Sequence, residues 1–293
     1  MEDNEQERPI RPLLSGPGMK LWLLVALYIG CYGIIILLMR TSAFDWLNAS
    51  MDNSTPLIAK LANGFFTLFV FLVPVLVFAN AALPEGFSYY RVQNKLGIVP
   101  MILCVVTILT SVFFIDYLSS VNISMLTEPE AVAEYQSLVE SSNWYSNMPG
   151  ISDLLVFLVC SAVIPAICEE LFFRGGIQQL LREWTRNAHT AIIITAFIFS
   201  LLHMDSFGFI PRFVLGVALG YLFWWTGSLK SSIIAHCTYN AFTIINAYVA
   251  QHNPEGWWAK LETTYVLAAI SLVVSLGAMF TVRNLTKRQN QSF

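Results

Sequence analysis

Long apolar segments recur along this 293-residue chain. A helix rises 1.5 Å per residue and needs about 20 residues to cross roughly 30 Å of hydrocarbon, so these segments are long enough to span a membrane. Hydrophobic residues make up 56% of the chain and charged residues only 12%, whereas soluble domains average about 25% charged residues. The mean hydropathy is +0.62. The sequence therefore predicts an all-α, polytopic membrane protein.

Helices are expected in every span, because the backbone must satisfy its own hydrogen bonds in lipid and the alternating segments of a β-barrel are absent. We place eight spans at residues 21–39, 57–83, 97–121, 153–175, 190–204, 209–227, 230–250 and 262–281. This division predicts a tail at 1–20, a single transmembrane domain at 21–282 and a second tail at 283–293.

Lysine and arginine are distributed unequally between the two sides that these spans define. Eleven fall on the side of the chain ends and four on the other, with Arg174 counted separately because it lies within a span. Cytoplasmic loops carry the excess of basic residues, so both ends are predicted to be cytoplasmic and the protein to lie in the inner or plasma membrane. The acidic connection 122–150 then lies outside. A net charge of −3 and scattered basic residues give no support to a nucleic-acid partner.

Three ionisable residues stand inside the fourth apolar segment: Glu169, Glu170 and Arg174. Such groups are costly in a membrane span and usually mark a functional site. On a helix, Glu170 and Arg174 are separated by four residues and can form an ion pair, whereas Glu169 points about 100° away. Glu169 would thus be free to accept a proton as a general base. The alternative is a buried ion pair that only fixes helix packing.

Two later spans carry histidines. His236 and Asn240 are four residues apart and share one helical face, from which both could donate hydrogen bonds to an oxyanion. Taken alone, such a pair is more often a contact between membrane helices. His203 follows Phe199 by four residues, and the phenyl ring could stack on the imidazole. Considered together, these motifs favour a functional site over separate structural contacts.

Glu169-Glu170-xxx-Arg174, Phe199-xxx-His203 and His236-xxx-Asn240, in that order on successive apolar segments, resemble the motifs of the CPBP (Abi) family of intramembrane proteases. This family includes the type II CAAX prenyl endopeptidases and bacteriocin-processing or immunity proteins. The resemblance covers about residues 150–250, which we take as a protease-like core.

The resemblance implies an integral-membrane endopeptidase, a hydrolase that cleaves a peptide or protein substrate held in or beside the bilayer, as in CAAX-box protein processing. Glu169 and His203 would activate the attacking water. His236 and Asn240 would stabilise the tetrahedral intermediate, and Glu170, Arg174 and Phe199 would support them. The motif positions show no departure from the family pattern. Whether the substrate must be prenylated is left open by the sequence.

The part played by metal is left open as well, and a metal-independent glutamate mechanism is favoured. Glu169, His203 and His236 form a His₂Glu set of the kind that holds catalytic zinc, which would make the protein metalloprotease-like. However, no HExxH motif places two ligands beside a base on one helical face. Either mechanism requires a water-filled cavity, which we expect to open toward the cytoplasm.

Two other function classes compete with the protease. A non-catalytic membrane scaffold could confer immunity by binding alone, and a transporter would also place charges within spans. Paired Gly/Pro-interrupted halves, which would favour a transporter, are not evident in the sequence.

Two further residues are given structural interpretations. Asp116, near the outer end of the third span, is interpreted as interfacial, and Pro165 is expected to kink the helix that carries Glu169.

Overall fold

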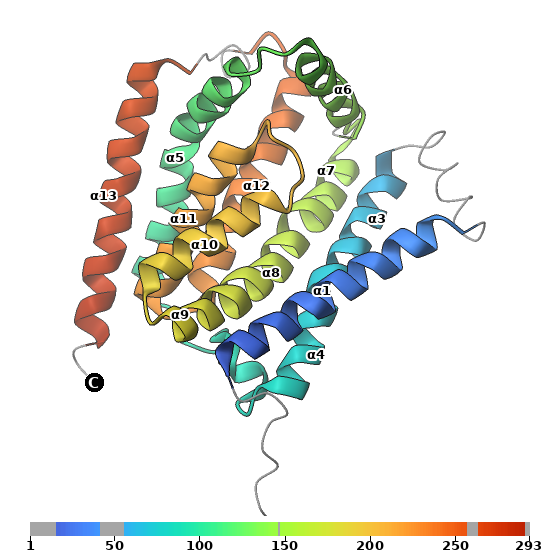
Figure 1. Cartoon of the computed structure of the whole chain (residues 1–293). Helices are drawn as coiled ribbons and strands as arrows, with labels where there is room; N and C mark the ends of the chain where they lie inside the picture. Colours follow the sequence, from blue (N-terminus) through green and yellow to red (C-terminus); the bar gives the residue numbers. More distant parts are fainter. Residues whose placement is uncertain (1–15, 42–55, 146, 257–262, 291–293) are drawn as a thin grey trace, which may run out of the picture.

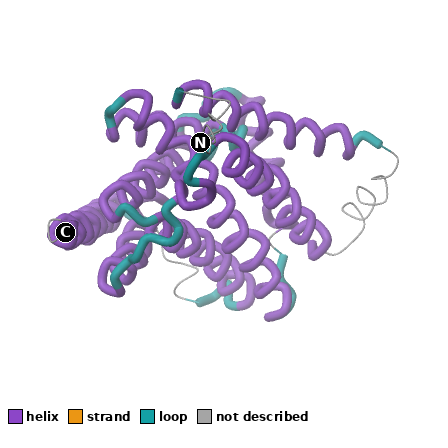
Figure 2. Tube along the Cα trace, turned by 90° about the horizontal axis from the view of Figure 1, so that it is seen from below, coloured by secondary structure: helices purple, strands orange, loops and turns teal. Residues whose placement is uncertain are grey.

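The computed structural model describes residues 16–41, 56–145, 147–256 and 263–290. Within these residues the chain is built from helices joined by short loops, which Figure 2 shows from below. The helices in the first half of the chain are α1 (Pro17–Met39), α3 (Pro56–Thr67), η2 (Leu68–Leu72), α4 (Val73–Ala82), η3 (Gly86–Tyr90), α5 (Ile98–Ser124) and α6 (Pro129–Tyr145). Those that follow are α7 (Ile151–Phe157), η4 (Leu158–Val163), α8 (Ile164–Glu170), η5 (Leu171–Gln178), α9 (Gln179–Thr185), α10 (Ala188–Leu201), α11 (Phe209–Thr226), α12 (Leu229–His252) and α13 (Tyr265–Asn290).

The all-α class predicted from the sequence is confirmed, because the described residues contain no strand. Six helical stretches among them are long and apolar enough to cross a membrane: 17–39, 57–82, 98–124, 151–185, 209–226 and 265–286. The other two predicted spans also form helices, but α10 has only 14 residues and α12, with 24 residues, is not among the six. Eight helical segments thus occupy the predicted positions, and six of them meet the criteria for a span.

The start of α1 and the end of α13 lie at the same end of the bundle, and α6 covers the opposite end (Figure 1). Both predicted tails are partly helical, because α1 starts at Pro17, before the predicted end of the first tail at 20, and α13 runs to Asn290, beyond the predicted start of the second tail at 283. The connection 122–150, expected to be a polar loop, contains the helix α6.

Prolines inside two membrane helices coincide with a change in hydrogen bonding. Pro74 and Pro165 each stand in the first turn of an α-helical stretch that directly follows a π-helical one, η2 and η4 respectively. Proline lacks an N–H and its ring collides with the carbonyl four residues earlier, and the wider π turn accommodates both defects. The irregularity predicted at Pro165 therefore takes the form of a π-helical segment before the proline, and the chain stays helical from Ile151 to Thr185.

This long helix extends ten residues beyond the span predicted to end at 175. Gly175 and Gly176 do not end it. A Cβ on Gly175 would lie 2.5 Å from the Tyr90 ring, and one on Gly176 would lie 2.7 Å from a Leu24 methyl group. These glycines therefore let η3 and α1 pack closely against η5, where the apolar core of this half of the bundle is centred.

Helices α10 and α11 also pack closely, because small residues face each other. A Cβ on Gly216 would lie 3.1 Å from the Cβ of Ala196, and one on Gly220 would lie 2.9 Å from Ile192. Gly216 and Gly220 form a GxxxG pattern, the arrangement that lets membrane helices approach at backbone distance. The approach brings the backbone of α11 within reach of polar side chains on η5.

Candidate active site

A buried ion pair lies at the centre of the bundle. The Arg174 Nη1 atom lies 2.6 Å from Oε1 of Glu170, and both side chains are 0% exposed. The pair predicted from the four-residue spacing is therefore present. Arg174 also donates from Nη2 to the carbonyl oxygen of Gly216 at 3.0 Å, and Gln178, one turn later, donates to the carbonyl oxygen of Gly220 at 3.1 Å. Two carbonyls of the GxxxG segment thus hold η5 against α11.

His236 on α12 completes a charged triad with this ion pair. Its Nδ1 atom lies 2.9 Å from the same Oε1 atom of Glu170 that accepts from Arg174, and its ring is almost fully buried. An ionised carboxylate can only accept hydrogen bonds, so we assign the proton to Nδ1 of His236. The second ring nitrogen, Nε2, is then the atom of His236 left for other partners. The contact is made by Glu170, the carboxylate expected to have a supporting role, and ties α12 to α8.

Phe199 joins the histidines to the triad. The Arg174 guanidinium carbon lies 4.7 Å from the centre of the Phe199 ring, and that ring meets the His203 and His236 rings edge-on at centroid distances of 5.1 and 5.8 Å. His203 is also held by a 2.8 Å hydrogen bond between its Nδ1 atom and the carbonyl oxygen of Phe199. The predicted stacking of Phe199 on His203 is therefore present, in an edge-on form.

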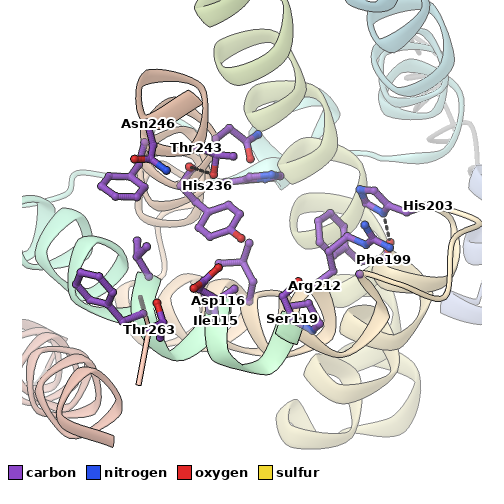
Figure 3. A pocket seen from close by; sticks show the side chains of 18 of the residues that line it. Ile115, Asp116, Ser119, Phe199, His203, Arg212, His236, Thr243, Asn246 and Thr263 are labelled. Carbon is purple, nitrogen blue, oxygen red and sulfur yellow. Dashed lines mark hydrogen bonds between the residues drawn. The ribbon is translucent and has the colours of Figure 1, made fainter. Parts of the chain in front are cut away.

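A polar cavity of about 620 Å³ brings His203, His236, Asn240 and Phe199 to a common space. Its wall comes from α5, α10, α11 and α12 and from the loop between α10 and α11 (Figure 3). His236 and Asn240 line it together, as expected of residues on one helical face. The volume lies within the roughly 300–1,000 Å³ of typical ligand pockets.

The cavity extends away from the chain ends. Its lining continues past Asn240 to Ala250, near the end of α12, and to Thr263 in the connection before α13. The end of α12 and the start of α13 lie at the end of the bundle that α6 covers, opposite to the start of α1 and the end of α13 (Figure 1). With the predicted orientation, this cavity extends toward the outer face and not toward the cytoplasm as we expected. The loop 202–208 between α10 and α11 borders this cavity through His203 and Gly208.

Glu169 lines a second cavity, of about 400 Å³, between α1, α3 and η2. The lining is largely aromatic and aliphatic, with Tyr28 and Tyr32 from α1 and Phe71 from η2. His203 lines this cavity as well as the larger one, and it is the one residue common to the two described linings. Glu169 and His236 therefore lie on different sides of His203, an arrangement that the motif spacing did not predict.

The three residues proposed as metal ligands do not form a ligand set in this geometry. Within the described part of the chain, no group of three His, Cys, Asp or Glu side chains lies close enough together to hold a metal ion. Two of the four histidine nitrogens in the candidate set are also engaged, Nδ1 of His203 by a backbone carbonyl and Nδ1 of His236 by Glu170.

Two features of the site were missed in the sequence. Asp116, interpreted as interfacial, lines the same cavity as His236. An acidic residue within a predicted membrane helix was the available signal. Gly216 and Gly220, whose carbonyls accept from Arg174 and Gln178, were also overlooked, although the GxxxG spacing is visible in the sequence.

The fold and this site define an integral membrane protein whose helices enclose a buried Glu–Arg–His cluster beside a polar cavity. Residues 151–242 match a family model described as type II CAAX prenyl endopeptidase Rce1-like. This segment is therefore similar to the Rce1-like family, and the predicted resemblance to the CPBP proteases is confirmed. The match supports a function of the kind that this family performs, that of an intramembrane protease. Comparison with curated proteins and with solved structures gave no match.

Proposed function

We propose that the protein is an endopeptidase that hydrolyses a peptide bond at the boundary between its two cavities, with Glu169 and His203 activating the water. The observation that carries this proposal is the position of His203. It lines the apolar cavity together with Glu169 and the polar cavity together with His236 and Asn240. A water molecule beside His203 would thus have a carboxylate on one side and hydrogen-bond donors on the other.

In this mechanism Glu169 accepts a proton from water as the oxygen attacks the carbonyl carbon of the scissile bond. The negative charge that forms on the carbonyl oxygen is stabilised by donors from Asn240 and His236, a kind of stabilisation worth about 3–4 kcal/mol per donor. The proton held by Glu169 then passes to the leaving nitrogen, and the C–N bond breaks. No step requires a group that the chain does not supply.

His236 donates to the oxyanion through Nε2 only when its ring is an imidazolium, because its other proton is on Nδ1. Glu170 accepts a hydrogen bond from Nδ1 at 2.9 Å and fixes the orientation of the ring. Arg174, in turn, holds Glu170 ionised and oriented. The proposal gives a role to the buried Glu170–Arg174 ion pair. The pair sets the position of the proton on His236 and the orientation of its ring, which faces the substrate.

The apolar cavity supports a substrate that is itself associated with the membrane. Helix α1 is only slightly buried within the bundle, and its residues Tyr28, Tyr32 and Met39 form one wall of the cavity at Glu169. We propose that a peptide or protein substrate reaches Glu169 from the lipid side, and that an attached apolar chain, prenyl or other, would occupy this cavity. The protein would lie in the inner or plasma membrane with both ends in the cytoplasm.

The decisive experiment uses the purified full chain in liposomes with quenched reporter peptides ending in a CAAX sequence, with and without a prenyl group. Wild-type protein should cleave them, whereas Glu169→Gln and His203→Ala should reduce kcat/KM by at least 100-fold without loss of folded protein. Glu134→Gln, on the exposed face of α6, is the matched control and should cleave like wild type. Equal cleavage by Glu169→Gln and wild type would contradict the proposal, and solute flux without cleavage would favour a transporter.

A second arm of the same experiment addresses metal. Because the described side chains form no three-residue ligand group, activity should be unchanged after dialysis against EDTA or 1,10-phenanthroline, and metal analysis should give less than one equivalent per chain. Activity that is lost with chelator and restored by zinc would show instead that Glu169, His203 and His236 rearrange into a metal site. The non-catalytic immunity or scaffold function is supported if binding to a peptide survives in Glu169→Gln and no cleavage is found with wild type.

A further inference from the structure

Asp116 brings a carboxylate into the polar cavity from α5, outside the segment that matches the protease family. Its side chain is exposed to the cavity, and the described contacts include neither a hydrogen bond nor an ion pair from its carboxylate. Figure 3 shows Asp116 projecting from α5 into the space that His236 and Arg212 also border. A charged group within a membrane helix is costly and is normally paired or used, so this carboxylate calls for a partner.

The other charged groups around the cavity are already compensated. Arg212 donates from Nη2 to Oδ1 of Asp205 at 2.6 Å and to the Asp205 carbonyl oxygen at 3.1 Å. Glu170, behind His236, is paired with Arg174 at 2.6 Å. Among the described residues of the lining, Asp116 is therefore the ionisable acid whose charge no neighbour neutralises, and it gives the cavity a negative wall.

Polar side chains continue this wall toward the end of the bundle. Ser119 lies three residues after Asp116 on α5, and Tyr239 and Thr243 face the same space from α12. Tyr239 is next to Asn240, the proposed oxyanion donor, so the negative wall and the reacting atoms belong to one continuous space. A peptide seated at His236 and Asn240 would present a neighbouring side chain to Asp116.

We infer that Asp116 is a specificity-determining residue that binds a lysine or arginine side chain of the substrate, next to the bond that is cut. This inference rests on the proposed function. A cation at this position would neutralise the only uncompensated charge in the described lining, and a charge-assisted hydrogen bond in a partly dehydrated site favours it over a neutral residue. An acidic residue would instead place two like charges in the same cavity.

The test uses quenched peptides of one apolar sequence in which a single residue is lysine, glutamine or glutamate, moved in turn through the positions around the centre. For at least one position, wild type should cleave the lysine peptide with a kcat/KM at least tenfold above that of the glutamine peptide, and the glutamate peptide least well. Asp116→Asn should bring the lysine-to-glutamine ratio to about 1, and Asp116→Lys should favour glutamate. Ser119→Ala, an uncharged change on the same wall, should keep the wild-type ratio.

Folding is controlled by thermal unfolding in detergent. Because Asp116 has no described partner, Asp116→Asn should unfold at or above the wild-type temperature, which separates a loss of selectivity from a loss of structure. An unchanged lysine preference in Asp116→Asn, or no preference at any position in wild type, would overturn the inference that Asp116 binds a cation. Cleavage of the peptides in the same assay would still support the proposed function.

Binding measurements distinguish a failure of the proposed hydrolysis from a failure of the proposed cation site. Fluorescence anisotropy of the same peptides on Glu169→Gln, alone and combined with Asp116→Asn, reports recognition without hydrolysis. If wild type cleaves none of the peptides but lysine peptides bind Glu169→Gln at least tenfold more tightly than glutamine peptides, and Asp116→Asn removes this difference, the cation site stands and the proposed hydrolysis fails. Equal binding of all three peptides would reject the cation site.

Discussion

Glu170 and His236, which are 66 residues apart in the sequence, share a hydrogen bond of 2.9 Å in the centre of the bundle. The same carboxylate oxygen accepts from Arg174, so one buried acid connects two helices and sets the proton position on the histidine. The neighbouring Glu169 makes no described hydrogen bond and instead lines a cavity. Adjacent glutamates thus have different surroundings, and this difference can be measured.

Glu170→Gln should destabilise the protein strongly, whereas Glu169→Gln should abolish activity with little effect on stability. Loss of the Glu170 charge leaves Arg174 buried and unpaired, a change that costs about 3–5 kcal/mol. Glu169 is half-buried against a cavity, so its change should alter the free energy of unfolding by less than about 1 kcal/mol. Thermal unfolding in detergent, run beside the cleavage assay, checks both. Similar melting temperatures for the two variants would contradict the division of roles.

Arg174→Lys should fail to replace arginine. Arg174 uses Nη1 for Glu170 and Nη2 for the Gly216 carbonyl, and a lysine ammonium cannot make both bonds in that geometry. We expect a loss of about 1–3 kcal/mol in stability together with reduced activity, because the orientation of Glu170 and His236 depends on this guanidinium. Arg40→Lys, an exposed change after the end of α1, is the control and should be neutral. A fully stable and active Arg174→Lys protein would show that one bond is enough.

Gly216→Ala should separate α10 from α11 and displace Phe199. The added Cβ would lie 3.1 Å from the Cβ of Ala196 and 3.4 Å from the Phe199 ring, and neither neighbour has room to move in a packed interface. The expected cost is about 1–3 kcal/mol, with lower activity because Phe199 positions both histidine rings. Gly30→Ala on α1, where a Cβ meets nothing within 4 Å, serves as the comparison and should be neutral or slightly stabilising.

Asp205 should make stability depend on pH. Burial would raise the pKa of Asp205, but hydrogen bonds from Arg212 and from the Gly208 N–H outweigh burial and hold the pKa below its usual range. A carboxylate with a lowered pKa stabilises the folded state above the unfolded pKa of about 3.9, and the effect disappears as the pH falls through the lower folded-state pKa. Asp205→Asn should therefore unfold below the wild-type temperature at pH 7, and the two should converge in strong acid.

The same variant should also reduce activity at pH 7, because Asp205 fixes the loop that carries His203. Thermal unfolding between pH 3 and pH 8 measures the first effect, and Glu134→Gln on α6 controls for a general loss of negative charge. A difference from wild type that stays constant down to pH 3 would show that Asp205 acts through packing and not through its charge.

Much of the fold followed from the sequence, because membrane helices are specified by local composition. The apolar runs placed helices at all eight predicted positions, and the four-residue spacing of Glu170 and Arg174 gave their ion pair, since both signals depend only on helix geometry. The span predicted to end at 175 was too short, because Gly175 and the residues after it continue the helix to Thr185. In the structure Gly175 admits Tyr90, a contact with a residue 85 positions away in the chain.

The sequence by itself determined which residue types gather in the Rce1-like segment and in what order they come. Only the tertiary structure decided that Glu170, and not Glu169, bonds to His236, and that His203 stands between two cavities. Only the structure brought Asp116 of α5 to the same space as Asn240 of α12. The physical reason is that spacing along one helix sets the direction of a side chain, whereas its partner is set by how closely two helices approach. Here that approach depends on glycines, π-helical turns and short helices whose effects appear only once the bundle is packed.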